Sequence, residues 1–453
     1  MGHHYITEVK NEKFVFTKRS RMIVGGVFIL GLLLTFLGMN QVNSTDSEAG
    51  HNETAMVVNT GQDHGEGATH SDAGAETHAE EHHAEHSTGS VRIWANFLLN
   101  SYYFLLFAVG ALFFMAVNYA ANAGWATLLK RIMEAMSSYL PIGLITIAIV
   151  LYVGRDHLYH WIEYVGLGLQ EGDAGFDKIL ESKTWFLNKG WFLYGVPIII
   201  AVWWLFRFIL VRFSNKEDAE GGLTFHKKSV GYSAGFLVFF AFSFSILSWL
   251  VMMSLDPHWY STIYSVYNFA IAFVTTLTVI GFFTLWLKSK GYMEMVSDEV
   301  IHDVGKFMFA FSIFWAYIWV AQFLLIWYAN IPEESIYFVQ RTTPHFKPLF
   351  RTNIIMCFFL PFLILMMRNA KRNPKVMLIA GAIILCGHWL DLYLMIMPGT
   401  VKDASGFGML EIGMTMAFAG FFIYWVLHAL SKKNLYPVNH PYLLESVNHD
   451  VGV

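Results

Sequence analysis

The sequence predicts an all-α integral membrane protein with ten transmembrane helices. Hydrophobic residues make up 55% of the 453-residue chain, charged residues make up only 14%, and the mean hydropathy is +0.44. A soluble protein of this length needs a charged exterior that so few charged residues cannot provide. The chain also contains ten apolar runs, most of them roughly 20 residues or longer, which is the length needed to cross the hydrocarbon layer. The net charge of −4 gives no indication of nucleic-acid binding.

The first apolar run extends from Met22 to Met39 and follows a basic N-terminal segment. Basic residues before an apolar run are typical of a signal sequence, but no small-x-small cleavage site follows Gly38. We therefore expect residues 1–40 to form a cytoplasmic N-terminus and an uncleaved signal-anchor helix.

A polar segment of different composition comes next, and we expect residues 41–92 to form a loop on the outer face. Between Gln41 and Ser90 it contains ten acidic residues, seven histidines and no aromatic residue. Such a segment cannot bury enough apolar surface to fold alone. Two interpretations stay open: the histidines capture a metal ion, or the segment is a solvated loop that docks on a partner.

Nine further apolar runs are long enough to span the membrane. They lie near residues 93–119, 137–157, 190–213, 230–254, 262–287, 306–329, 350–368, 376–397 and 408–430. Because ten crossings return the chain to the side where it began, both termini should be cytoplasmic. The distribution of Lys and Arg agrees, since most of them fall in the segments assigned to the cytoplasm.

The connection between the fifth and sixth spans should be a tight turn. Pro257 removes a backbone donor and disfavours helix in the residues before it, so Ser254 to His258 should turn between two long helices. The turn places Asp256 and His258 among Trp and Tyr side chains of the kind found where helices leave the membrane.

A weak internal repeat predicts two similar halves. A Trp-Leu pair that is followed by a proline occurs at Trp249 and again at Trp389. We therefore predict one four-helix bundle in residues 93–254, from spans 2–5, and a second in residues 255–397, from spans 6–9. Helices 1 and 10 would be peripheral, and residues 398–453 would form the last helix and a cytoplasmic tail.

His388 and Asp391 are three residues apart, so they share a helix face inside the ninth span. An ionisable pair at that depth is costly unless it faces the bundle interior or a wet cavity, so it is a candidate for proton transfer or quinone contact. The alternative is a hydrogen-bonded pair that only locks helix packing. A haem ligand is disfavoured, because no other span places a second histidine at the same depth.

Titratable residues are expected to gather at the outer membrane boundary, among tryptophan and tyrosine side chains. They are Arg155, Asp156, His157, Asp256, His258 and Asp391. Acidic and imidazole groups beside a flat aromatic wall suit a quinone headgroup, whose oxygens need a proton donor and a proton acceptor. The alternative is an ordinary interfacial belt with its charges facing water.

A second set of polar residues suggests a proton pathway that enters from the inner side. Its members are His302, Asp303 and Lys306 at the inner end of span 7, with Thr275, Thr276 and Gln322 inside the spans. Hydroxyl and amide groups at membrane depth can hold water and pass protons, although more often they hydrogen-bond neighbouring helices.

The sequence predicts no catalytic residue, no metal-ligand set and no cofactor held covalently or by ligation. Both cysteines, Cys357 and Cys386, lie inside apolar runs, and the chain has no CxxC or c-type haem motif.

Three strings carry a resemblance to a known family. They are SLDPHWYST from Ser254, QFLLIWYANIPEE from Gln322 and GHWLDLYLMIMPG from Gly387. Together they resemble the second of the two large quinol-oxidoreductase membrane subunits of bacterial alternative complex III, within the polysulfide-reductase-type membrane-anchor family. The resemblance covers residues 93–430 and does not include the histidine-rich segment.

This resemblance implies two four-helix bundles plus peripheral helices, in a respiratory complex of the bacterial inner membrane. The complex would pass electrons from menaquinol to c-type cytochromes or directly to a terminal oxidase. Iron–sulfur clusters and c-type haems would belong to an iron–sulfur subunit and to multi-haem cytochrome subunits. A homologous membrane subunit would be the better candidate for the working quinol site. Asp256, His258, His388 and Asp391 match the family's polar positions, which leaves quinone binding and proton conduction both open.

Two other functions stay open. A secondary transporter would also have repeats and polar residues within the membrane, usually with Gly- or Pro-broken helices at matching positions. The prolines within or beside spans here, Pro141, Pro197 and Pro361, form no matched pair. A pure scaffold predicts that Asp391→Asn and His388→Ala alter assembly and leave turnover unchanged.

Overall fold

The computed structural model describes residues 11–60, 88–169, 171–173 and 175–450. These residues form helices and their connections, and the strand-like feature among them is one isolated bridge between Lys13 and Asn434. Ten helical runs are long and apolar enough to cross a membrane. The prediction of an all-helical, multi-pass membrane protein with ten spans is therefore confirmed.

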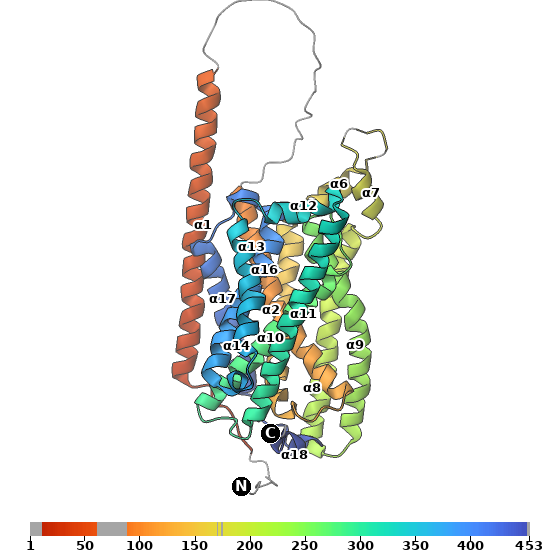
Figure 1. Cartoon of the computed structure of the whole chain (residues 1–453), viewed down its shortest axis with the longest axis vertical. Helices are drawn as coiled ribbons and strands as arrows, with labels where there is room; N and C mark the ends of the chain where they lie inside the picture. Colours follow the sequence, from red (N-terminus) through yellow and green to blue (C-terminus); the bar gives the residue numbers. More distant parts are fainter. Residues whose placement is uncertain (1–10, 61–87, 170, 174, 451–453) are drawn as a thin grey trace, which may run out of the picture.

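The ten runs follow the chain in the predicted order (Figure 1). They are α1 (Lys18–Thr60, apolar enough to span over Lys18–Val42); α2 (Thr88–Ala120); the run Thr127–Leu158 with α3 (Lys130–Ser137), α4 (Leu140–Ile149) and α5 (Arg155–Leu158); the run Trp191–Glu220 with α8 (Val196–Glu220); the run Thr224–Leu255 with α9 (Thr224–Val251); α10 (Tyr264–Ser289); α11 (Asp298–Ala329); the run Lys347–Leu365 with α13 (Lys347–Ile354) and α14 (Leu360–Leu365); α16 (Pro374–Thr400); and α17 (Met409–Leu430).

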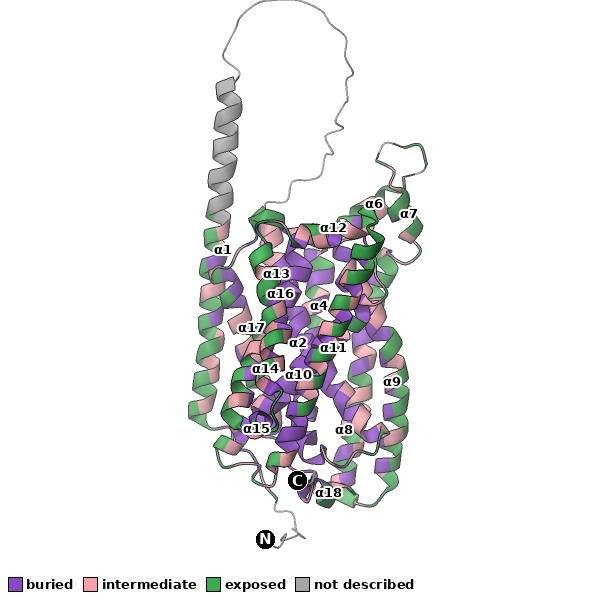
Figure 2. Ribbon diagram, in the orientation of Figure 1, coloured by how far each residue is buried: buried purple, intermediate pink, exposed green. Residues whose placement is uncertain are grey.

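Short helices cover the two ends of this bundle (Figures 1 and 2). At one end lie α15 (Arg368–Arg372) and α18 (Leu443–Val447), together with both described chain ends, and we call it the terminal end. At the other, which we call the opposite end, lie α6 (Trp161–Leu167), α7 (Lys178–Lys183) and α12 (Pro332–Arg341).

The largest differences from the predicted helix boundaries are in α1 and in the third run. Helix α1 continues to Thr60, into the segment expected to be a loop, because a helix satisfies its backbone hydrogen bonds locally and this stretch contains no proline. The third run begins at Thr127 rather than near residue 137, because Lys130 and Arg131 are buried against acidic partners. Residues 61–87 and the side chains of 45–60 lie outside the described residues, and the two interpretations of the histidine-rich segment fall there.

Helices α2 and α10 form the centre of the molecule. In their most apolar stretches 78% and 89% of the residues are buried, against 11% in α1 and 28% in α11 (Figure 2). Large apolar side chains stay exposed along α1, α8 and α11, as expected for helix faces that contact lipid.

The helix neighbours follow from this central pair. Helix α2 packs against α4, α9, α10, α16 and α17, and α8 closes a ring between α4 and α9. Helix α10 packs against α11 and α16, while α13 and α14 pack against α16. Buried groups from different spans therefore meet around α2 and α10.

Helix α1 is attached mainly through α17. A Cβ atom added to Gly31 would lie 2.3 Å from the backbone nitrogen of Ala417, and one added to Gly413 would lie 2.4 Å from that of Thr35. Such close backbone approach requires small residues at the interface. The two helices therefore form a tight pair beside the central helices.

Candidate functional site

The turn after α9 forms as predicted, at the opposite end of the bundle. One short helical turn covers Met253–Leu255, and the backbone N–H of Trp259 donates to the carbonyl of Asp256 over 3.1 Å. Helix α10 then begins at Tyr264. The turn holds Asp256 and His258 beside the helix ends.

An aromatic cavity of about 440 Å³ lies beside this turn. It is lined by Ser182, Lys183, Trp185, Phe186, Leu187, Trp249, Met253, Ser254, Pro257, Trp259, Tyr260, Ser261 and Thr262. The indole nitrogens of Trp249 and Trp259 are buried, and neither has a protein partner in the described part of the chain. We call this space the outer aromatic cavity.

Lys183 of α7 holds the turn against the cavity. Its ammonium group donates to the backbone carbonyls of Pro257 at 2.5 Å and His258 at 3.2 Å. Burial lowers the pKa of Lys183, and the nearby charge of Asp177 opposes that change. Lys183 therefore lines the cavity and ties the turn to α7 through the backbone carbonyls of the turn.

His258 is paired with Asp177 rather than with Asp256. Its Nε2 lies 2.5 Å from the Asp177 carboxylate, and the Asp177 side chain caps α7 by accepting from the N–H groups of Ile179 and Leu180. Burial raises the pKa of Asp177, but His258 and these two N–H groups together outweigh it, so the net pKa is lowered. The result is a half-exposed imidazole–carboxylate pair at the rim of the outer aromatic cavity.

Asp256 is paired with Arg341, a residue that the sequence did not single out. The Arg341 guanidinium donates to Asp256 and to the carbonyl of Met395, each over 3.0 Å, and stacks 3.3 Å from the centre of the Tyr337 ring. The Trp259 ring also stacks on the Tyr337 ring, with the two ring centroids 3.9 Å apart. Burial lowers the pKa of Arg341, but Tyr337 and Asp256 together raise it above its ordinary value.

The other predicted members of the outer group have partners of their own. Arg155 and Asp156 form an exposed pair 3.2 Å apart. The His157 ring stacks on Trp94 at 6.2 Å, and its Nδ1 lies 3.3 Å from the hydroxyl of Ser90. The expected gathering is thus a set of local pairs along the opposite end.

Asp391 lies in a separate buried cluster among four helices. Its carboxylate accepts from Tyr267 at 2.5 Å, Asn353 at 2.8 Å and Trp315 at 2.9 Å. His388 Nδ1 lies 3.6 Å away, and its buried Nε2 has no partner in the described structure. Neither His388 nor Asp391 lines either of the two large cavities. The geometry therefore favours the packing interpretation of this pair.

Cys357, His388 and Asp391 also lie close enough together to be considered as metal ligands. The thiol of Cys357, however, donates to Asn353 over 3.0 Å, and three donors already occupy the Asp391 oxygens. A metal ion would have to displace these bonds, so we assign none.

The inner candidates do not form one cluster. Asp303 lies 2.5 Å from Lys306 and 2.7 Å from His449 of the C-terminal tail, while His302 lies 3.7 Å from Glu299. Gln322 is buried on the same helix, about 30 Å further along at 1.5 Å per residue.

The two threonines bond to helix backbones. Thr275 donates to the Ile271 carbonyl over 2.6 Å, and Thr276 lies 3.4 Å from the carbonyl of Leu106 on α2. The first bond lies within α10 and the second joins α10 to α2, and neither requires a water-filled route.

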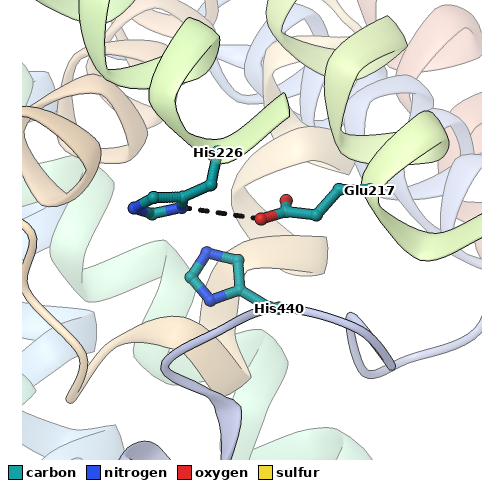
Figure 3. Close-up of side chains that lie close together, drawn as sticks. All are labelled: Glu217, His226 and His440. Atoms are coloured by element: carbon teal, nitrogen blue, oxygen red, sulfur yellow. Dashed lines mark ion pairs between the residues drawn. The ribbon is translucent and has the colours of Figure 1, made fainter. Parts of the chain in front are cut away.

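The structure also contains a buried cluster that sequence reasoning missed. Glu217 lies in the last turn of α8, His226 lies in the first turn of α9 and His440 lies in the C-terminal tail, yet their side chains converge (Figure 3). Glu217 lies 3.5 Å from His226 and 3.1 Å from Lys130. The tail carries no apolar periodicity, so no pattern in the sequence indicates that His440 returns to the bundle.

Two histidines and a glutamate suit zinc, but the hydrogen bonds favour a metal-free cluster. His440 Nδ1 accepts the backbone N–H of Tyr442 over 3.3 Å, so the proton of the neutral ring lies on Nε2. Figure 3 shows the other nitrogen of His440 turned toward Glu217 and His226. The buried His440 ring packs against the His226 ring, with the ring centroids 5.3 Å apart, and so holds the tail against α9.

We expect acidification to loosen this tail. Burial, followed by the charge of Lys130, lowers the pKa of His440 to about 3 from an ordinary value of 6.5. Between pH 3 and pH 6.5, His440 binds a proton in the released tail and not in the docked tail. Docking of the tail is therefore strongest above pH 6.5 and weakens as pH falls. Hydrogen exchange of residues 437–448, corrected for intrinsic rates, should show opening that rises by at most about tenfold per pH unit.

The control for this experiment is His440→Gln, which should open more readily and lose most of the pH response. His226→Gln, which leaves His440 in place, should keep the response. A wild-type tail whose opening is independent of pH between 7 and 5 would contradict the assignment.

No protein-family model matches the chain, and no curated protein matches it either.

Proposed function

We propose that this chain is an integral membrane subunit of a respiratory quinol oxidoreductase of the alternative complex III type. It would lie in the bacterial inner membrane with both termini in the cytoplasm, so that the opposite end faces outward. Its contribution would be a quinone-facing site at that end. The three sequence strings suggest the complex, and the outer aromatic cavity is the observation that carries the proposal.

The walls of the cavity suit a planar headgroup. Trp249, Trp259 and Tyr260 supply aromatic faces. In this proposal the indole N–H groups of Trp249 and Trp259, which are buried without a protein partner in the described structure, donate to the carbonyl oxygens of the bound headgroup. A volume of about 440 Å³ lies in the range of small-molecule sites. Buried donors left unpaired cost free energy, and an acceptor-bearing ligand would remove that cost.

The rim of the cavity supplies a route for protons. Pro257 and Trp259 line the cavity on either side of His258, whose imidazole is paired with the Asp177 carboxylate. Oxidation of one quinol releases two electrons and two protons. In this proposal His258 accepts the two protons one after the other and passes each to water at the exposed end, while the two electrons would leave through iron–sulfur clusters and c-type haems of partner subunits.

The helix arrangement proposed for this function is two four-helix bundles. The contacts of α2, α4, α8 and α9 support the first, and those of α10, α11, α13–α14 and α16 support the second. The pair α1 and α17 would be peripheral, and α2 and α10 would join the bundles. This arrangement places the cavity where the two bundles are connected.

A second candidate, a structural scaffold for the same complex, is favoured by the Asp391 cluster. Its carboxylate accepts hydrogen bonds from three neighbouring helices, as expected of a group that holds helices together. In that case the subunit would anchor its partners and take no part in turnover.

The test begins with purification in mild detergent, followed by a haem spectrum and identification of the copurified subunits. Haem-containing and iron–sulfur partners are expected, together with quinol-dependent electron transfer. A cofactor-free homo-oligomer would refute the respiratory function and favour a transporter.

Variants of the purified complex then test the site itself. Trp249→Phe, which keeps the aromatic face and removes the donor, should raise the KM for quinol about five- to tenfold, as expected for one lost hydrogen bond. His258→Ala should lower kcat by about 100-fold. Trp204→Phe, at a lipid-exposed position on α8, is the matched control. Normal kinetics in both site variants would leave the scaffold as the function.

A further inference from the structure

A second and larger cavity, of about 810 Å³, is lined by residues of the α1–α17 pair on one side and of α2, α10 and α16 on the other. Its lining is almost entirely apolar and runs from Ser20 and Lys290 at the terminal end to Phe407 and Glu411 at the opposite end. We call it the lateral cavity. It lies among membrane-spanning helices, so its natural occupants are molecules that dissolve in the bilayer.

The polar groups along the lateral cavity are almost all engaged by the protein. The Glu411 carboxylate accepts from Arg92 at 2.8 Å, Asn96 at 3.1 Å and the backbone N–H of Gly408 at 2.8 Å. Tyr103 donates to the carbonyl of Leu385 over 2.7 Å. These bonds leave little for a headgroup at the opposite end, and the cavity suits hydrocarbon chains.

One lining hydroxyl, that of Thr415, is buried without a protein partner in the described structure. A single hydroxyl cannot serve the two oxygens on opposite edges of a quinone ring. The wall is therefore a poor match to a quinone headgroup and a better match to saturated chains.

The terminal end of the lateral cavity has a different character, because it is basic. Lys290 lines the cavity and is exposed, and Ser20 lines it from the start of α1, where Lys18, Arg19 and Arg21 are exposed. Glu12 is an acidic residue on the segment before α1, and its carboxylate is engaged because it accepts the backbone N–H of Met293 over 2.8 Å.

The C-terminal end of α17 adds to this positive charge. His428 lies within electrostatic reach of both Lys432 and Arg21, and Lys432 is exposed. The mouth of the lateral cavity therefore has one lining cation, Lys290, and further exposed cations on the adjoining turn of α1 and just after α17.

We propose that the lateral cavity binds one anionic phospholipid, with its phosphate at Lys290 and its acyl chains between α1, α17 and the central helices. Basic groups beside pockets between membrane helices attract anionic headgroups, and each Lys or Arg contributes to the attraction. The apolar interior supplies the contact for the chains. The lipid would complete the packing of α1, which otherwise touches the protein mainly through α17. This inference does not depend on quinol chemistry.

The test is native mass spectrometry of the full-length protein, stripped of lipid and titrated with phosphatidylglycerol or phosphatidylcholine in detergent. One phosphatidylglycerol should bind with at least tenfold preference over phosphatidylcholine. Lys290→Glu should weaken its binding by an order of magnitude, since it replaces an attraction by a repulsion. Lys227→Glu, at an exposed lysine on the terminal end of α9, is the charge-matched control and should have little effect.

A second variant probes the chains rather than the headgroup. Ala419→Trp fills part of the lateral cavity and should reduce binding of phosphatidylglycerol and phosphatidylcholine alike, while Lys290→Glu affects only the anionic lipid. Equal binding of the two lipids by the wild type, equal effects of Lys290→Glu and Lys227→Glu, or a quinone as the retained molecule would each overturn the proposal.

Discussion

Replacing Asp256 by asparagine is expected to destabilise the protein by about 3 kcal/mol, because it leaves the buried charge of Arg341 without its counter-ion. The side chain of Arg341 is only 3% exposed, and its remaining contacts are neutral groups, the carbonyls of Met395 and Tyr337 and the Tyr337 ring. Thermal unfolding in detergent, followed by tryptophan fluorescence, should therefore show a midpoint lowered by a few degrees.

Two further variants identify the cause of that loss. Asp156→Asn removes the carboxylate of an ion pair whose acid is 60% exposed, so it should change stability by less than about 1 kcal/mol. Asp256→Asn combined with Arg341→Met removes both buried charges and should cost less than the sum of the single changes. Additive losses, or an unaltered midpoint in Asp256→Asn, would contradict the ion pair.

The sequence predicted the spans because they depend on local properties. A run of apolar residues long enough for the membrane is visible without knowledge of its neighbours, and all ten were found. The start of the third span was missed because it depends on residues that are distant in the sequence. Lys130 and Arg131 look like solvent-facing residues, and only the acidic partners on other helices show that they are buried.

The site at the opposite end was predicted in part: the turn lies where it was expected, but Asp256 and His258 have partners that were not expected. Pro257 fixed the position of the turn, but the pairing of Asp256 with Arg341 joins residues 85 positions apart. Arg341 lies on α12, a short helix with no membrane-type pattern. Trp249 and Trp259 looked like interfacial anchors, and their role as walls of a cavity depends on how α7 folds over them.

The same limit applies to Asp391. Its depth and its spacing from His388 were visible in the sequence, and both placed it inside the bundle. Its three donors come from α10, α11 and α13, and the sequence holds no pattern that links them. Whether a buried carboxylate is a proton carrier or a packing element depends on those donors.

Replacing Asp391 by alanine is expected to be the most damaging single change, with a loss of about 3 to 5 kcal/mol. Three donors from Tyr267, Trp315 and Asn353 would remain buried without an acceptor, each at a cost of roughly 1–3 kcal/mol, partly relieved by rearrangement. The yield of folded protein and the unfolding midpoint in detergent should both fall. Asp403→Ala removes an exposed acid in the connection after α16, so it should change neither the yield nor the unfolding midpoint.

Milder variants then separate packing from chemistry. Tyr267→Phe removes one donor and should cost about 1 kcal/mol, and His388→Ala should also lower stability while leaving the carboxylate bonded. If the cluster only joins helices, intact complexes carrying Asp391→Asn or His388→Ala will oxidise quinol at the wild-type rate per folded molecule. A turnover loss of tenfold or more in fully assembled complexes would instead make Asp391 a proton carrier, because hydrogen bonding alone affects the folded fraction and not the rate of each folded molecule.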